Sequence, residues 1–367
     1  MHSSPGVNGR RLWLRLFVAQ GVGSTTVARL RDEFQTVEEV FAAGVERFHS
    51  LPGGLGVYEA IHHPDLEPHI DRLEEQVAAI PGARLVTPTC AEYPSRLRKR
   101  SILPAALFVR GSLQEQSPAL AVVGSRRTGA HSAALTRDWC QELAAGGVSI
   151  VSGLAEGIDA AAHEGALLAP GHTVAVLGTG LAKTYPRNHA ALQDRILATG
   201  GAVISQFAPF SPMHPGLFPA RNATMAALSD AVLVMQAGTR SGALITAEYA
   251  RRFQVPVLAV PSHPGDPTGA GCLQLLKKGA LLVTSTEDVA EVLGGKSPAA
   301  ARPKKEEPVL PDELRKVYDE LDFQGSGLDE LTRRLDWPAG AVLDVLLRLE
   351  LAGVAARQPG PRYVRTK

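Results

Sequence analysis

The sequence predicts an α/β protein whose middle segment forms an extended Rossmann-like parallel sheet. Two patterns predict this fold: continuous apolar runs of strand length, and alanine-rich helical stretches between them. Strands that are apolar along their whole length suit a parallel sheet that helices cover on both faces. The expected strands are residues 119–123, 148–151, 173–177, 202–204, 231–235, 255–260 and 281–283. The expected helices between them are residues 132–145, 159–168, 189–198, 242–253 and 272–278.

The segment before this sheet, residues 1–84, is predicted to form short helices separated by glycine turns. A Gly-Val-Gly-Ser turn at residues 21–24 precedes a helical pattern over residues 25–34, with Ser24 as the expected N-cap. A second glycine turn lies at residues 51–56. This order resembles helix-hairpin-helix and SAM-like domains, in which turn amides can hold a DNA phosphate. Because the segment has few lysines, a small helical packing module is the favoured alternative.

The segment after the sheet begins with a linker that is rich in proline, alanine and lysine. Three helical patterns and two short strand patterns follow, an order similar to that of a winged-helix domain. The third helix, residues 338–351, carries mainly leucine and valine, and Arg348 is its only basic residue. A helix that reads duplex DNA needs basic and hydrogen-bonding side chains, so this helix favours contact with protein. The predicted division of the chain is residues 1–84, 85–295, 296–310 (the linker) and 311–367.

Composition limits where the protein works and how it could bind nucleic acid. The 367-residue chain is 45% hydrophobic and 20% charged, and its net charge is +1. No apolar run reaches the about 20 residues of a membrane-spanning helix, and the first residues lack the pattern of a secretory signal. Cys90, Cys140 and Cys272 are far apart and odd in number, which fits a reducing compartment. We therefore expect a cytoplasmic protein without a membrane span, in which any nucleic-acid site is a local pocket.

Glycine-rich turns follow four of the expected strands. In an open parallel sheet, ligands bind at the carboxyl ends of the strands, where glycine allows close backbone approach and helix amides face an anion. Arg126 and Lys183 stand in two of these turns and add positive charge. The backbone amides expected to hold phosphates are those of Gly124, Ser125, Gly153 and Gly157. The candidate phosphate-binding residues are Gly124, Ser125, Arg126, Ser152, Gly153, Gly157, Lys183, Ser241 and Gly242.

The sequence lacks the motifs of several enzyme classes. It has no G-x-x-x-x-G-K-[ST] loop and no GxGxxG turn followed by an acidic strand end, which argues against ATP hydrolysis and dinucleotide binding. The histidines do not pair with acids at metal-ligand spacing, so we expect neither a metal nor a cofactor. His163 lies one helical turn after Asp159, and a helix N-cap followed by a packing histidine is favoured over an acid/base pair. We predict that the protein is not an enzyme.

The glycine turns also carry a resemblance to the DprA/Smf family, the DNA-processing protein A family of bacteria. Residues 121–127, Ala-Val-Val-Gly-Ser-Arg-Arg, resemble the first strand and turn of that family. Residues 151–159, Val-Ser-Gly-Leu-Ala-Glu-Gly-Ile-Asp, match its most distinctive motif almost position by position. The resemblance is strong from about residue 93 to about residue 292, and the ordered set of motifs is far more specific than any one of them. Further matching segments are residues 178–181, 185–186, 218–222 and 241–247.

The resemblance implies a homodimeric protein that binds single-stranded DNA, protects incoming DNA and loads the RecA recombinase in natural transformation. It assigns phosphate contact to Arg126 and to the basic residue after the third strand, here Lys183. It also implies that Arg221 and Asn222 line the same pocket. Because few aromatic residues lie near the glycine turns, base stacking is expected to contribute little. Three departures from the family pattern remove a charge or a polar contact expected near the pocket: Gln206, Ala223 and Cys272.

Two alternatives stay open. Nucleotide phosphoribohydrolases of the lysine decarboxylase-like group have a similar core and bind a nucleotide phosphate on a glycine turn that precedes a catalytic glutamate. Residues 238–243, with Glu248 beyond them, occupy the comparable place here, although the diglycine of that signature is absent. A protein-interaction scaffold without a phosphate site is the third alternative.

Overall fold

The computed structural model describes residues 7–115, 117–295, 310–321, 325–358, 360 and 362–365. The chain forms two compact units, Met1–Ala301 and Arg302–Lys367. The predicted linker, residues 296–310, lies outside the described residues except for Leu310. The further division of the first unit between residues 84 and 85 stays a prediction. Within the described ranges, no helix is both long enough and apolar enough to cross a membrane.

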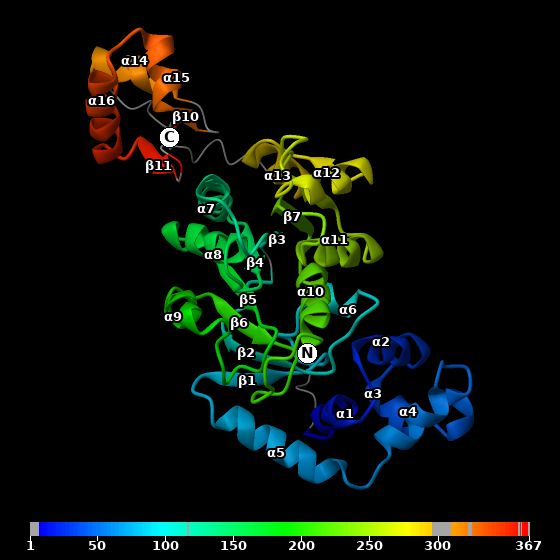
Figure 1. The fold of residues 1–367 in the computed structure, drawn as a ribbon. Helices are drawn as coiled ribbons and strands as arrows, with labels where there is room; N and C mark the ends of the chain where they lie inside the picture. The colour runs from blue at the N-terminus through cyan, green and yellow to red at the C-terminus, as the bar shows by residue number, and fades with distance from the viewer. Residues whose placement is uncertain are drawn as a thin grey trace. The chain divides into compact units, whose positions relative to one another are not determined.

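The first unit contains a nine-stranded sheet in the order β1-β2-β6-β5-β4-β3-β7-β8-β9 (Figure 1). All seven expected strands are present, and they run parallel to one another, which confirms the predicted Rossmann-like sheet. Two further strands, β1 and β2, extend the sheet beyond β6 in antiparallel pairing. The strands are β1 Ala83–Val86, β2 Leu107–Gly111, β3 Ala119–Gly124, β4 Ser149–Ser152, β5 Thr173–Val176, β6 Ala202–Ser205, β7 Ala231–Gln236, β8 Val257–Ala259 and β9 Leu281–Leu282.

Helices cover both faces of this sheet, as the apolar strands require. Leu120 and Val122 of β3 belong to a core with residues of α7, α8 and α13, whereas Ala121 and Val123 belong to a second core with residues of α10, α11 and α12. This alternation follows from the period-two pleat of a strand. The helix α10 is an addition to the predicted set. The helices of this part are α6 Ser95–Arg98, α7 Ala130–Ala145, α8 Ile158–Leu168, η2 Arg187–His189, α9 Ala190–Ala198, α10 Leu217–Ala227, α11 Ala243–Arg252, α12 Ala270–Lys277 and α13 Thr286–Val292.

Residues 7–78 form the expected short helices, and these pack against the sheet. Leu14 and Ile70 share a buried cluster with Phe108 of β2. The predicted N-cap is wrong, because α2 begins one residue earlier than expected: Ser24 is its first residue, and Gly23 is an N-cap without a side-chain hydrogen bond. The helices are α1 Val7–Val18, α2 Ser24–Glu33, α3 Val37–Ala42, η1 Val45–Phe48, α4 Gly54–Ile61 and α5 Leu66–Ala78.

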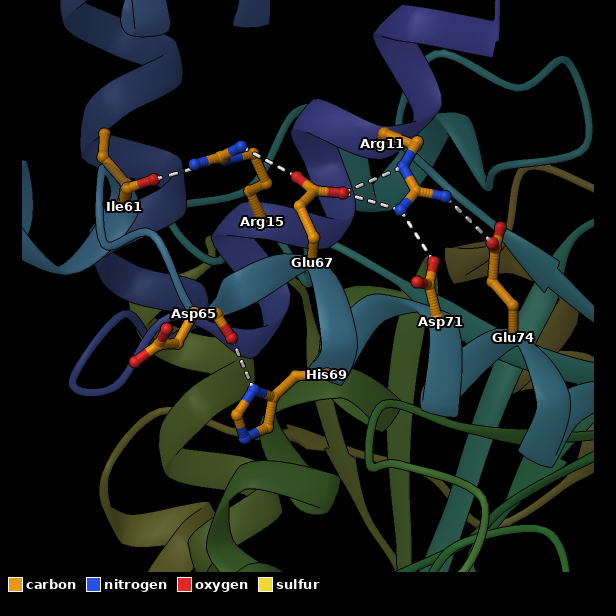
Figure 2. A network of polar contacts seen from close by, with 8 residues as sticks. All are labelled: Arg11, Arg15, Ile61, Asp65, Glu67, His69, Asp71 and Glu74. Atoms are coloured by element: carbon orange, nitrogen blue, oxygen red, sulfur yellow. Dashed lines mark hydrogen bonds and ion pairs between the residues drawn. The ribbon is translucent and has the colours of Figure 1, made fainter.

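An ion-pair network joins α1 to α5 (Figure 2). Arg11 donates to Glu67 Oε2 at 2.6 Å and to Asp71 Oδ1 at 2.8 Å, and Arg15 donates to Glu67 Oε1 at 2.8 Å. Hydrogen bonds to Asp71 and Glu67 raise the pKa of Arg11 above its ordinary value. Because these guanidinium groups already pair with carboxylates, they offer little free charge to DNA, which favours the packing-module alternative for this segment.

The second unit has the predicted winged-helix order. Its three helices enclose a small core that includes Val317, Leu331 and Val345, and its three-stranded sheet has the order β10-β12-β11 with antiparallel pairing. The predicted two-stranded wing is therefore present, with a short additional strand beside it. The elements are α14 Asp312–Glu320, β10 Ser326–Gly327, α15 Leu328–Leu335, α16 Ala339–Leu351, β11 Ala355–Gln358 and β12 Arg362–Arg365.

Candidate nucleic-acid interface

A pocket with a volume of about 470 Å³ lies beside the carboxyl end of β3. β3 stands between β4 and β7, so the chain proceeds away from β3 in both directions and the strand order reverses there. Such a topological switch point is where open α/β sheets bind ligands. The lining comes from residues 123–127, Ala155 and Asp159, and from parts of α10 and the start of α11. The structure thus places a pocket where the glycine turns predict one.

Most of the predicted site residues meet in this pocket. Those that line it are Gly124, Ser125, Arg126, Arg221, Asn222, Ser241 and Gly242. Those that do not line it are Ser152, Gly153, Gly157 and Lys183. The first group comes from the end of β3 and the loop after it, from α10 and from the loop before α11, so three segments far apart in the sequence converge.

Three arginines line the pocket, Arg126, Arg127 and Arg221, and two of them contact one aromatic ring. The guanidinium carbon of Arg126 lies 5.1 Å from the centre of the Phe218 ring, and that of Arg221 lies 5.7 Å from it. Arg126 is exposed, and it forms no ion pair with any residue that the structure describes. A cation over an aromatic face is held in place without losing its charge. Arg126 is therefore an oriented and unneutralised cation at the pocket.

Arg221 is buried, and its Nη1 lies 3.7 Å from Asp159 Oδ2. Both side chains of this ion pair are almost completely shielded from solvent. Burial raises the pKa of Asp159, and the attraction of Arg221 and hydrogen bonds from the Gly153 and Ala155 amides oppose that rise. Burial likewise lowers the pKa of Arg221, but an arginine stays protonated in proteins. Among the described residues, its Nε and Nη1 have no hydrogen-bond partner. Nη1 is the atom that faces Asp159 in the ion pair, and both nitrogens are buried, so Arg221 places a positive charge at the pocket wall without an exposed donor.

The predicted role of the backbone amides is wrong for two of the four residues. The Ser125 amide donates to Gln236 O at 2.8 Å, and the Gly153 amide donates to Asp159 Oδ2 at 3.2 Å. Both amides are used within the fold, because one bonds the end of β7 and the other bonds the Asp159 carboxylate of α8. Side chains, and above all Arg126, must then carry most of the contact with an anion.

The residues that do not line the pocket support its loops. Ser152 Oγ donates to Val122 O at 2.7 Å and is fully buried. Gly157 has φ +76°, and a side chain there would collide with the carbonyl oxygens of Ser125 and Arg126. A side chain at Gly153 would collide with the Arg221 guanidinium. Glycine is therefore required at both positions so that the Arg126 loop and Arg221 can approach.

Lys183 is exposed on the loop after β5, outside the pocket lining. Thr179 Oγ1 donates to its carbonyl at 3.1 Å, which shapes this loop. The ring of Tyr185, on the same loop, lies 6.1 Å from the ring of Phe218. The loop therefore runs near the pocket wall, although Lys183 itself is not part of that wall.

The three departures from the family pattern also lie outside the lining. Ala223 and Cys272 are buried in the hydrophobic core, and burial raises the pKa of the Cys272 thiol to about 11. Gln206 accepts a hydrogen bond from Thr224 Oγ1. None of these three side chains lines the pocket, and their predicted effect on a charge or polar contact near it stays a prediction.

Sequence reasoning missed Phe218 as a pocket residue. The aromatic ring lies within the matched segment at residues 218–222, but a proline at its second position hid the helix that begins at Leu217. Proline is tolerated in the first turn of a helix. On that helix Phe218 and Arg221 stand three residues apart, on one face, which is the signal that could have placed them together.

Neither enzyme candidate has support in the geometry. His163 is fully buried, its Nδ1 lies 2.7 Å from Thr173 Oγ1, and burial lowers its pKa to about 3. It is a packing histidine, as favoured, although the predicted N-cap is wrong because Gly157 caps α8 and Asp159 lies inside the helix. Glu248 is exposed and pairs with Arg252 at 3.3 Å, away from the pocket. In the described part of the chain, no group of histidine, cysteine or acidic residues could hold a metal.

Comparison with known proteins places these features in a family. The family model described as "DNA recombination-mediator protein A" matches residues 84–294, more than half of the chain, and a model described as "DprA winged helix domain" matches residues 298–361. The chain is 33% identical to Protein Smf of Synechocystis sp. over 96% of its own length and 98% of that protein.

Solved structures agree with the sequence comparison. The X-ray structure of DNA processing protein A from Streptococcus pneumoniae has a TM-score of 0.63 and 31% identity, covering 78% of this chain and 98% of that one. A DNA processing protein A from Helicobacter pylori, whose structure describes a single-stranded DNA binding mode, has a TM-score of 0.51 and 28% identity, covering 57% of this chain and 95% of that one. Members of the family are recombination mediators rather than enzymes. This chain belongs to the DNA recombination-mediator protein A family, also called DprA or Smf.

Proposed function

We propose that this chain binds single-stranded DNA by its phosphates at the pocket beside β3. The observation that carries the proposal is Arg126, a cation that is exposed, oriented on Phe218 and unpaired among the described residues. Arg221 adds a second positive charge in the wall of the same pocket, although that charge is shared with Asp159. The H. pylori relative, whose structure describes binding of single-stranded DNA, supports the choice of ligand.

The proposed roles follow from where each residue lies. Arg126 would bind a phosphate directly, and Arg221 would hold a second negative charge from inside the pocket. Lys183, exposed on the neighbouring loop, would contact the strand where it leaves the pocket. Ser152, Gly153 and Gly157 would act through the loops that they shape. The walls of the pocket would come from Gly124, Ser125, Asn222, Ser241 and Gly242.

A pocket of about 470 Å³ holds only a few nucleotides, so a longer strand needs more than one pocket. We therefore propose a homodimer in which two pockets bind one strand. We further propose that the protein works in the cytoplasm, protects incoming single strands and loads the RecA recombinase on them in natural transformation. Its membership of a family of recombination mediators supports these roles.

The test is fluorescence anisotropy with a labelled single-stranded oligonucleotide, competed by unlabelled single strand or by duplex of the same sequence. We expect the single strand to compete better than the duplex, and Arg126→Ala to weaken binding on the order of tenfold, the value of a charged hydrogen bond to phosphate. Equal binding by the wild type and Arg126→Ala would overturn the proposal. Hydrolysis of a nucleoside monophosphate by the wild type, without DNA binding, would replace it with the phosphoribohydrolase alternative.

A further inference from the structure

A series of side-chain hydrogen bonds runs from the Arg126 loop to the loop after β8. Thr128 Oγ1 donates to Gln236 Oε1 at 2.8 Å, and Gln236 Nε2 donates to Thr268 Oγ1 at 2.9 Å. Thr268 Oγ1 in turn donates to Asp266 Oδ1 at 2.7 Å. These four residues are called here the Gln236 network. The network joins three segments that are far apart in the sequence, namely the loop after β3, the end of β7 and the loop after β8.

Asp266 sets the direction of every bond in the Gln236 network. A carboxylate only accepts hydrogen bonds, so the single hydroxyl proton of Thr268 points to Asp266. The Thr268 hydroxyl therefore accepts from the amide nitrogen of Gln236, which turns the amide oxygen of Gln236 towards Thr128. The opposite orientation of this amide would bring two acceptors together at Thr268. An acidic residue outside the pocket lining thus orders a side chain that contacts the Arg126 loop.

Gln236 holds the Arg126 loop at both ends. Its backbone carbonyl accepts from the Ser125 amide at 2.8 Å, and its side chain accepts from Thr128 Oγ1 at 2.8 Å. Arg126 lies between these two anchors. Gln236 is 9% exposed, so water competes little for its side-chain hydrogen bonds. A loop that is tied at both ends has fewer conformations, which fixes the backbone from which the Arg126 side chain projects.

We propose that the Gln236 network positions Arg126 for DNA, so that Asp266 strengthens binding although it carries a negative charge. This inference rests on the proposed function of the pocket. Electrostatics alone predicts the opposite, since removing an acidic residue should strengthen the binding of DNA or leave it unchanged. Preorganisation predicts weaker binding, because a loop that has lost an anchor must be ordered when the phosphate binds. Gln236 and Asp266 are positioning residues, and neither lines the pocket.

Limited trypsin digestion of the full chain tests the positioning without DNA. Trypsin cleaves after arginine, so cleavage after Arg126 and Arg127, measured by mass spectrometry, reports how often this loop opens. Gln236→Met keeps the length of the side chain but removes both of its hydrogen bonds, so cleavage there should become several times faster while other sites are cleaved as before. Asp266→Ala should act in the same direction, whereas Asp266→Asn should match the wild type because its amide oxygen still accepts from Thr268. Unchanged cleavage in Gln236→Met would overturn the proposal.

Anisotropy with a labelled single-stranded oligonucleotide tests the effect on binding. Gln236→Met and Asp266→Ala should each weaken binding by about fivefold, the value of about one net hydrogen bond. Asp266→Asn should bind at least as well as the wild type. The matched control is Asp194→Ala, which removes an exposed acidic side chain from α9 and should not change the affinity. Binding that Asp266→Ala leaves unchanged or strengthens would overturn the proposal, because electrostatics alone then describes Asp266.

A double variant separates this proposal from the proposed function. In the Arg126→Ala background, Gln236→Met should weaken binding no further, and an equal loss in both backgrounds would show that Gln236 acts elsewhere. If Arg126→Ala loses affinity but Gln236→Met does not, the proposed function stands and the Gln236 network does not position Arg126. If Arg126→Ala binds like the wild type, the pocket is not a DNA site, and the proposal falls with it whatever the cleavage rates are.

Discussion

The pocket beside β3 and the winged-helix unit both contain arginines, but they use them differently. At the pocket, Arg126 has no acidic partner among the described residues, and Arg221 shares its carboxylate in a buried pair. In the winged-helix unit, Arg348 and Arg365 pair with carboxylates at the surface. The proposed binding of an anion at the pocket rests on a cation that is left unpaired and oriented. The number of basic residues is a poor guide, which explains how a chain of net charge +1 can belong to a family of DNA-binding proteins.

The two regions also differ in how much stability is lost when one partner of an ion pair is removed. The side chains of Arg221 and Asp159 are 5% and 9% exposed, whereas those of Arg348 and Glu313 are 45% and 62% exposed. An exposed pair gives a small stabilisation because water already solvates both charges. A buried pair must not lose one partner, because the other charge is then left without solvent or counter-ion. Substitutions in the two regions should therefore have unequal effects.

The largest expected effect is that of Arg221→Met. Removing the guanidinium leaves Asp159 buried and uncompensated, so we expect the free energy of unfolding to fall by about 3 kcal/mol. The matched change Arg348→Met, in the exposed pair, should cost less than about 1 kcal/mol. Urea denaturation followed by circular dichroism measures both. Equal losses for the two variants would contradict the contrast between buried and exposed pairs, and Asp159→Asn added to Arg221→Met should restore part of the loss.

A second prediction concerns His163, which is buried behind the pocket. Burial lowers its pKa to about 3, below the value of about 6.5 in an unfolded chain. Between these values the unfolded state binds the proton and the folded state does not, so stability falls as pH falls from about 6.5 towards 3. His163→Gln should remove about 1.4 kcal/mol per pH unit from that slope. The measurement is the free energy of unfolding of the wild type and of His163→Gln at several pH values. If the two curves of stability against pH are parallel, His163 does not cause the loss of stability at low pH.

A smaller effect is expected from Gly157→Ala. Gly157 and Gly200 have similar positive φ angles, +76° and +84°, but only Gly157 abuts the carbonyls of Ser125 and Arg126. Both changes should cost about 1 kcal/mol of backbone strain, and Gly157→Ala should cost more than Gly200→Ala because its Cβ would also collide with those carbonyl oxygens. Gly157→Ala should in addition displace the Arg126 loop and lower the affinity for single-stranded DNA, which Gly200→Ala should leave unchanged. Equal affinities of the two variants would show that the loop position does not matter.

The sequence predicts the sheet well because its strands are apolar on both faces. This pattern can be recognised within each short segment, without knowledge of which residues pack together in the fold. It also places the pocket, since carboxyl ends of parallel strands share one edge. It does not predict that Ser125 and Gly153 use their amides within the fold, because those partners, Gln236 at the end of β7 and Asp159 in α8, belong to other elements. It likewise misses the ring of Phe218, whose position depends on a helix that a proline disguised.

Arg126 is the proposed cation that meets DNA, and the salt dependence of binding tests this role most directly. For single strands, each phosphate neutralised contributes about −0.7 to the slope of log affinity against log salt. Measured by anisotropy at several salt concentrations, Arg126→Ala should bind more weakly, with a slope shallower by about 0.7. Arg348→Ala, which removes the same charge from the winged-helix unit, should match the wild type in both. If Arg126→Ala keeps the wild-type slope while Arg348→Ala loses it, the pocket is not the DNA site and the contrast drawn between the two regions is wrong.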